Sequence, residues 1–190
     1  MDNKTYKMVL VSLFAALTAV GAFIRIPVPP VSFTMQTCFV VFAGLILGAR
    51  LGFAAQAVYI AIGLVGVPVF ASGGGIQYIL NPTFGYLVGF MGAAFVTGAI
   101  AEKITKPSFI RYFLASLVGL LPVYLIGVPY LYVILKYVNH AQVSFWGVAM
   151  SGFIVFIPWD IVKVAFASLM AKEIYVRAGF IFKQIKLKRN

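Results

Sequence analysis

Asp160 and Lys163 carry the only charges within a long apolar stretch, Phe145–Ala171, and Asp160 lies near its middle. Because they are three residues apart, they project from the same face of a helix. The pair can either bind a polar ligand or neutralise itself as an internal ion pair. A charge at the membrane centre costs at least about 2.5–3.5 kcal/mol on insertion scales, and a self-neutralising pair adds little stability over apolar side chains. We therefore expect a polar ligand site here, where Pro158 also frees a backbone carbonyl.

A second unusual feature is the segment Gly66–Pro82, which contains no charged residue and many apolar ones. A solvated loop would be polar, so we expect this segment to pack into the protein as a lid. Gly73, Gly74 and Gly75 allow positive φ and a close approach of the backbone to a ligand, although a glycine triplet is also typical of a flexible turn. Asn81 precedes a proline at the start of a helix, where it can cap the helix, contact a ligand, or do both.

The segment Pro27–Gln36 is stiffened by its prolines and leads into the next apolar stretch. Gln36 lies just inside that stretch, so its amide can point into the protein. Arg25 precedes the segment and either attracts an anionic solute or lies at the membrane interface with its charge in water.

Several kinds of chemistry are excluded by what the sequence lacks. The single cysteine, Cys38, excludes an intramolecular disulfide, and the single histidine, His140, argues against a histidine-built metal centre. There is no phosphate-binding Gly-Lys-Ser/Thr loop, so the chain does not hydrolyse ATP itself. Acid–base catalysis often needs two tunable groups, whereas Asp160 is the only carboxylate in the apolar stretches. We expect no enzymatic activity, no metal and no cofactor.

The elements that position these residues are membrane helices. Of 190 residues, 63% are hydrophobic and 10% are charged, against about 25% charged in soluble domains. A membrane-spanning helix needs about 20 mostly apolar residues, and six stretches are long enough or nearly so: Met8–Phe23, Phe33–Ala49, Leu51–Val67, Thr83–Ala101, Tyr112–Leu135 and Phe145–Ala171. We predict an all-α polytopic membrane protein with six transmembrane helices in one domain, residues 1–190, and a basic tail from about residue 172.

The second and third stretches are short for full spans and meet at a tight turn, Gly48–Gly52. They can therefore form a re-entrant hairpin. We favour two true spans, because Arg50 would otherwise lie at depth without a nearby carboxylate.

The basic residues predict the orientation, because they gather on the cytoplasmic side of membrane proteins. With the N-terminus inside, two basic residues, Arg25 and Lys136, lie outside, and Lys163 lies within the sixth stretch. The other twelve lie inside: Lys4, Lys7, Arg50, Lys103, Lys106, Arg111, Lys172, Arg177, Lys183, Lys186, Lys188 and Arg189. Both termini are therefore predicted to be cytoplasmic, and the tail is a basic patch at the inner leaflet.

Ala15 and Ala19 form a small-residue strip on the first predicted helix. Such a strip lets another helix approach closely. That helix can belong to this chain or to another subunit.

Five sequence motifs together resemble the BioY family, the biotin-specific S-components of energy-coupling-factor (ECF) transporters. The resemblance covers most of the chain, from about Ala15 to Lys172. The motifs are Pro27-x-Pro29 followed by Phe33-Thr34-x-Gln36; Ala43-Gly44-x-x-Leu47-Gly48-x-Arg50-x-Gly52; Gly66-Val67-Pro68-Val69-Phe70-Ala71-x-Gly73-Gly74-Gly75; Pro82-Thr83-x-Gly85-Tyr86-x-x-Gly89-Phe90; and Pro158-x-Asp160-x-x-Lys163. The resemblance implies a six-helix protein of the bacterial cell membrane that binds biotin from outside. It also implies a transmembrane coupling subunit and two cytoplasmic ATPases as partners, with Ala15 and Ala19 at the coupling interface.

Biotin suits the unusual residues, because its body is apolar and its ureido group has two N–H donors and one carbonyl acceptor. The candidate substrate-binding residues are Asp160, Lys163, Asn81, Gly73, Gly74, Gly75, Gln36 and Tyr86. We favour the ureido ring near Asp160 and Lys163. An S-component or a facilitator for another small vitamin, a membrane enzyme acting on a lipid, and a structural subunit without a ligand are the alternatives.

Overall fold

The structure, a computed structural model, describes residues 3–27 and 31–177 and is almost entirely helical. In chain order the elements are α1 (Asn3–Phe23), β1 (Arg25–Ile26), β2 (Phe33–Thr34), α2 (Gln36–Leu47), α3 (Ala49–Leu64), the 3-10 helix η1 (Ile76–Leu80), α4 (Phe84–Ala101), α5 (Phe109–Gly119), α6 (Leu121–Val133), the π-helical turn η2 (Ile134–Val138), α7 (Phe145–Ala149), the π-helical turn η3 (Met150–Ile154) and α8 (Ile157–Arg177). The expected all-α membrane fold is confirmed. Three residues of the proline-rich segment, 28–30, and the tail beyond residue 177 lie outside the described residues.

Four of the helical segments are long and apolar enough to cross a membrane: Lys4–Phe23, Phe84–Ala101, Phe109–Val138 and Phe145–Arg177. The other two, α2 and α3, have 12 and 16 residues. At 1.5 Å per residue they extend about 18 and 24 Å, against a hydrocarbon core of about 30 Å. The six segments correspond to the six expected stretches, but the number of complete crossings stays a prediction.

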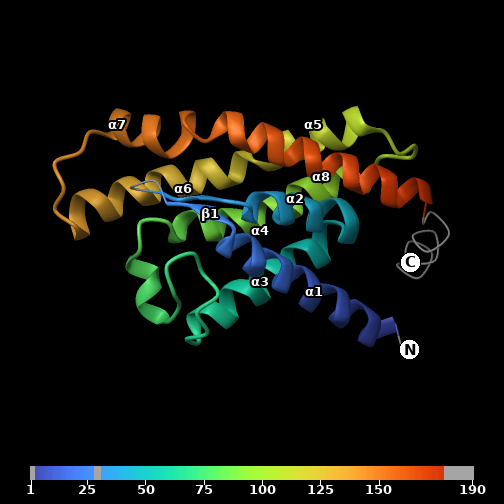
Figure 1. Cartoon of the computed structure of the whole chain (residues 1–190), viewed down its shortest axis with the longest axis horizontal. Helices are drawn as coiled ribbons and strands as arrows, with labels where there is room; N and C mark the ends of the chain where they lie inside the picture. Colours follow the sequence, from blue (N-terminus) through green and yellow to red (C-terminus); the bar gives the residue numbers. More distant parts are fainter. Residues whose placement is uncertain (1–2, 28–30, 178–190) are drawn as a thin grey trace.

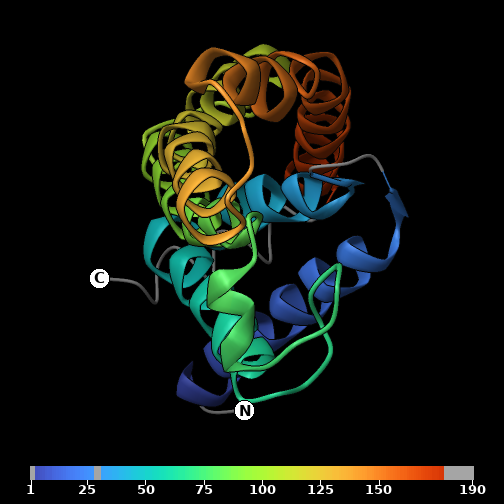
Figure 2. The ribbon, with the colours of Figure 1, turned by 90° about the vertical axis from the view of Figure 1, so that its left-hand side faces the viewer.

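The bundle has two distinct ends. α1 begins and α8 ends at the same end (Figure 1). The loop between α3 and α4 lies at the opposite end and crosses the front of the bundle when that end faces the viewer (Figure 2). β1 and β2 form a small antiparallel pair, in which Arg25 faces Thr34 and Ile26 faces Phe33.

α4 lies against α2, α3, α5 and α6 and is the central helix of the bundle. Glycines allow this close packing: a Cβ on Gly98 would lie 2.3 Å from the backbone nitrogen of Ala49. The turn between α2 and α3 passes through Gly48, which has a φ of 80°, a conformation that favours glycine. The backbone N–H of Ala49 donates a hydrogen bond of 2.7 Å to Glu102 Oε1, so the end of α4 holds this turn in place.

The last apolar stretch is not one continuous helix. It is divided into α7, the π turn η3 and α8, with residues 155 and 156 between the last two. Asp160 therefore lies in the first turn of α8, not in the middle of an unbroken helix as the sequence indicated. The Tyr86 hydroxyl donates a 2.8 Å hydrogen bond to the carbonyl of Gly152 within η3. π turns often mark functional sites, and this one is next to the charged pair.

The loop of residues 66–82 packs into the bundle through Phe70 and Tyr78, whereas Val67, Ile76 and Leu80 are exposed, and its role as a lid stays a prediction. Phe70 is 1% exposed and lies between the rings of Tyr59 and Tyr78, with ring centroids 5.4 and 4.5 Å away. The backbone N–H of Gly75 donates to the carbonyl of Gly63 at 2.7 Å. These contacts fix the loop to α3.

Gly98 provides a test of the close packing between α4 and the turn at Gly48. We expect Gly98→Ala to destabilise the protein by about 1–3 kcal/mol, because the added methyl group meets backbone atoms that cannot rotate away. Denaturant unfolding in detergent measures this change. Gly147→Ala is the control, since that Cβ would meet only the Ser144 hydroxyl at 3.2 Å. Equal stability of the two variants would contradict the packing argument.

Candidate functional site

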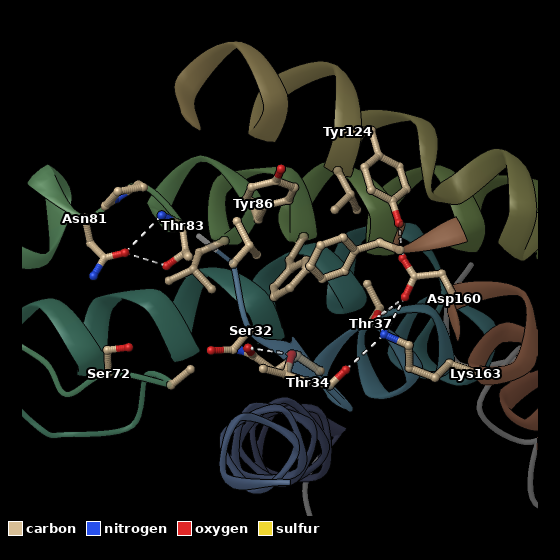
Figure 3. A pocket seen from close by; sticks show the side chains of 18 of the residues that line it. Ser32, Thr34, Thr37, Ser72, Asn81, Thr83, Tyr86, Tyr124, Asp160 and Lys163 are labelled. Carbon is tan, nitrogen blue, oxygen red and sulfur yellow. Dashed lines mark hydrogen bonds and ion pairs between the residues drawn. The ribbon is translucent and has the colours of Figure 1, made fainter. Parts of the chain in front are cut away.

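A cavity of about 180 Å³ opens inside the bundle near the lid end. It is lined by side chains from α2, α4, α6, α8, the segment around β2 and the lid loop: Val31, Ser32, Thr34, Gln36, Thr37, Ala71, Ser72, Tyr78, Asn81, Pro82, Thr83, Tyr86, Leu87, Phe90, Val123, Tyr124, Phe156, Asp160 and Lys163. Its polar side chains gather at two ends, with Tyr86 between them (Figure 3). Figure 3 places Asp160 and Lys163 at one end and Asn81 and Thr83 at the other.

At the deep end, Asp160 and Lys163 form an ion pair and are 3% and 7% exposed. The Lys163 ammonium also donates to Thr37 Oγ1 at 2.7 Å and to the Thr34 carbonyl at 2.9 Å. An ammonium has three N–H donors, so all three are used inside the protein. Lys163 therefore has no donor left for a ligand unless one of these bonds breaks.

Toward the residues that the structure describes, the Asp160 carboxylate keeps one acceptor position open. Its Oδ1 accepts from Lys163 and, at 3.0 Å, from Thr37 Oγ1. Its Oδ2 accepts one hydrogen bond, from the Tyr124 hydroxyl. A carboxylate has about four acceptor sites, so Oδ2 can accept one further hydrogen bond.

The middle of the cavity is apolar and aromatic. Leu87, Phe90 and Val123 line it from α4 and α6. The Phe156 ring stacks on Phe33 with ring centroids 4.2 Å apart, which holds the break between η3 and α8 against β2. This part of the wall can bury a compact apolar ligand body.

The shallow end carries neutral polar groups. Asn81 Oδ1 accepts from the backbone N–H of Thr83 at 3.0 Å and from its hydroxyl at 2.7 Å, so Asn81 forms the turn that starts α4. Among the described residues its amide nitrogen has no hydrogen-bond partner and is available to a ligand. Ser72 of the lid loop lines the same end, and Ser32, from the segment before β2, lies nearer the middle of the cavity (Figure 3).

Gln36 connects the cavity wall to the lid. Its Oε1 accepts from Thr34 Oγ1 at 3.1 Å, and its Nε2 donates to the Tyr59 hydroxyl at 2.8 Å. Tyr59 in turn donates to the carbonyl of Val69 in the lid loop at 3.1 Å. Since the Thr34 carbonyl accepts from Lys163, a continuous polar chain runs from the ion pair to the lid.

The structure brings together Asp160, Lys163, Gln36, Asn81 and Tyr86, all of which line the cavity. Gly73, Gly74 and Gly75 do not line it. The backbone explains why these three residues are glycines. Gly73 and Gly75 have φ of 117° and 101°, and a Cβ on Gly74 would lie 2.3 Å from the Val67 carbonyl oxygen. Contact between these glycines and a ligand stays a prediction.

The small-residue strip faces this chain's own core. Ala15 is 3% exposed and belongs to the hydrophobic cluster that surrounds the cavity, and Ala19 is half-buried against it. The contact of these two residues with a coupling subunit stays a prediction.

Sequence reasoning missed Thr37 and Tyr124. Both hydrogen-bond to Asp160 from helices that are distant in the chain. Each is an ordinary residue within an apolar stretch, so neither residue type indicated the site. The only available signal was the number of hydrogen bonds that a buried carboxylate and a buried ammonium require. Within residues 3–27 and 31–177 no group of three His, Cys, Asp or Glu side chains could hold a metal ion.

The chain is similar to known proteins over nearly its whole length. A family model described as the BioY family matches residues 1–179. A probable biotin transporter BioY of Lysinibacillus sphaericus is 47% identical over 191 residues, covering 100% of this chain and 97% of the relative. A biotin transporter BioY of Thermotoga maritima is 39% identical over 166 residues, covering 87% of this chain and 93% of the relative.

A solved structure also matches, described as the S-component for biotin from an ECF-type ABC transporter. Its TM-score is 0.79 at 23% identity, with 92% of this chain and 94% of that chain covered. This likeness shows that the two share a fold.

The buried pair gives a stability prediction. Asp160→Leu leaves Lys163 buried without a counter-charge and should cost about 3–5 kcal/mol, whereas Asp160→Leu with Lys163→Leu should recover much of this loss. Unfolding of the purified protein in detergent measures both. Thr97→Val is the control, because Thr97 is buried and its hydroxyl has no partner among the described residues. A double variant as unstable as the single one would mean that Thr37 and Tyr124, left without Asp160, account for the loss.

Proposed function

The chain belongs to the BioY family, and from this membership we propose that it binds biotin in the cavity and mediates biotin uptake as the substrate-binding subunit of an ECF transporter. It is a multi-pass protein of the cell membrane. The observation that supports this function most directly is the cavity itself, which has a charged deep end, an apolar middle and a neutral polar shallow end. We propose that biotin is bound and transported without chemical change.

The chemical groups of biotin follow one another in an order that matches the deep end, the middle and the shallow end of the cavity. Its ureido group donates two hydrogen bonds and accepts one, its ring body and aliphatic chain are apolar, and its carboxylate is an anion. The open acceptor on Asp160 Oδ2 calls for a donor, which a ureido N–H supplies. The Tyr124 oxygen, which already donates to Asp160, can accept a second N–H. The ureido ring therefore lies at the deep end.

The carboxylate lies at the shallow end in this orientation. Beside Asp160 it would meet a negative charge and an ammonium whose donors are already used. At the shallow end it meets neutral donors, the Asn81 amide and the Ser72 hydroxyl, together with the solvent side of the lid. The lid loop closes over the ligand, and the polar chain through Gln36 and Tyr59 holds the loop in its closed position.

ATP-driven uptake would require partners, because the sequence has no ATP-binding loop. The proposed partners are a transmembrane coupling subunit and two cytoplasmic ATPases. The proposed orientation places both termini, and the loop between α4 and α5, in the cytoplasm, with the lid outside. Of the two residues assigned to the coupling interface, Ala19 is the more accessible.

Biotin titration of Asp160→Asn tests the binding site. The variant loses a hydrogen bond to a charged group, worth roughly 1.5–3 kcal/mol, so we expect the affinity to fall about ten- to a hundred-and-fifty-fold. Isothermal titration of monodisperse protein in detergent measures it. Thr97→Val, which is distant from the cavity lining, should bind like the wild type.

Biotin analogues separate the function from the orientation. An analogue methylated on both ureido nitrogens should lose far more affinity than the amide of the biotin carboxylate. The reverse order would overturn the orientation and keep biotin as the ligand. Wild-type protein that binds no biotin would overturn the proposed function.

Thiol labelling in intact cells tests the topology. In a variant with Cys38→Ala, a cysteine at Asn139 should react with an impermeant reagent, and one at Ser108 should not. Asn139 follows η2 at the lid end, and Ser108 precedes α5 at the opposite end. If only the cysteine at Ser108 reacted, the protein would have the opposite orientation in the membrane.

A further inference from the structure

A second hollow lies on the outer surface of the bundle, between α3 and α4. It is an open groove of about 460 Å³, lined by Phe53, Gly92, Phe95 and Val96, with Arg50 as its only charged residue. It is separate from the biotin cavity and shares no residue with it.

The groove has the shape and surface of a site for a hydrocarbon chain. Gly92 contributes only backbone to the wall of the groove, since a Cβ at this position would point toward Pro122 of α6. The Phe53 and Phe95 rings meet edge to face, with centroids 6.5 Å apart, and they are 43% and 45% exposed. A groove walled by exposed aromatic rings within the membrane is in contact with lipid chains.

Arg50 gives the groove a polar end. It is the second residue of α3 and is exposed. Among the described residues, none of the ion pairs includes it. Glu102 accepts the backbone N–H of Ala49, the residue before Arg50. Within the part of the chain that the structure describes, the Arg50 guanidinium thus has no ion-pair partner, and it lies at one end of an apolar groove.

We propose that this groove binds one anionic phospholipid of the cytoplasmic leaflet, with the phosphate on Arg50 and an acyl chain against Phe53, Gly92 and Phe95. A guanidinium can donate two parallel hydrogen bonds to a phosphate. Basic pockets between membrane helices on the cytoplasmic side bind such headgroups. The proposal does not depend on biotin binding.

Lipid retention by the purified full chain tests this site. The chain in detergent is mixed with equal amounts of phosphatidylglycerol and phosphatidylcholine, and bound lipid is counted by native mass spectrometry. We expect one tightly held phosphatidylglycerol per chain. Arg50→Gln should weaken its retention about fivefold, as expected for one cation at a lipid surface. Lys103→Gln removes an exposed charge at the same end, outside the groove, and should leave retention unchanged.

The apolar wall has its own matched pair of variants. Phe53→Ala should reduce retention, whereas Phe166→Ala, which removes an exposed ring from α8, should not. Inorganic phosphate should fail to displace the lipid, because it cannot fill the groove.

Three results would overturn the proposal. Equal retention in Arg50→Gln and Lys103→Gln would remove the role of Arg50. Displacement of the lipid by inorganic phosphate would show that the site binds anions in general and does not require an acyl chain. A mass of two chains without bound lipid would assign the groove to a second copy of the protein.

Discussion

The ion pair between Asp160 and Lys163 can be buried only if the rest of the protein satisfies its remaining hydrogen bonds. Thr37 of α2, the Thr34 carbonyl of β2 and Tyr124 of α6 do so. Because buried charges without partners are costly, these bonds fix α2, α6 and α8 relative to one another. The walls of the cavity are therefore set by the same interaction that makes its deep end polar.

That arrangement extends beyond the deep end. Lys163 donates to the Thr34 carbonyl, and the Thr34 hydroxyl donates to Gln36. Gln36 in turn donates to Tyr59, whose hydroxyl donates to the carbonyl of Val69 in the lid. A ligand that displaces any member of this chain changes the hydrogen bonds of the next. Binding at Asp160 and the position of the lid are thus linked by contiguous polar contacts, in a setting where few alternative partners exist for a displaced group.

The sequence was sufficient for the helical class, the six apolar segments and the charged pair, because composition, segment length and an isolated charge at depth are local signals. It was not sufficient for Thr37 and Tyr124, whose roles arise only when residues 123 and 36 positions apart meet. The π turn before α8 was also missed: Tyr86, from a distant helix, hydrogen-bonds to the carbonyl of Gly152 within it, and no local sequence pattern indicates that contact. Ala15 shows a further limit, since a small-residue strip does not reveal which helix it faces.

The shortness of α3 has a consequence for the surrounding bilayer. α2 is buried among the other helices, whereas α3 exposes Phe53 and Ile62 and extends about 24 Å, less than a hydrocarbon core of about 30 Å. Lipids beside α3 must compress or the helix ends must remain below the headgroups, at fractions of a kcal/mol per Å of mismatch. A thinner membrane would therefore relieve the mismatch beside α3, while it would increase the mismatch around the 33-residue segment Phe145–Arg177.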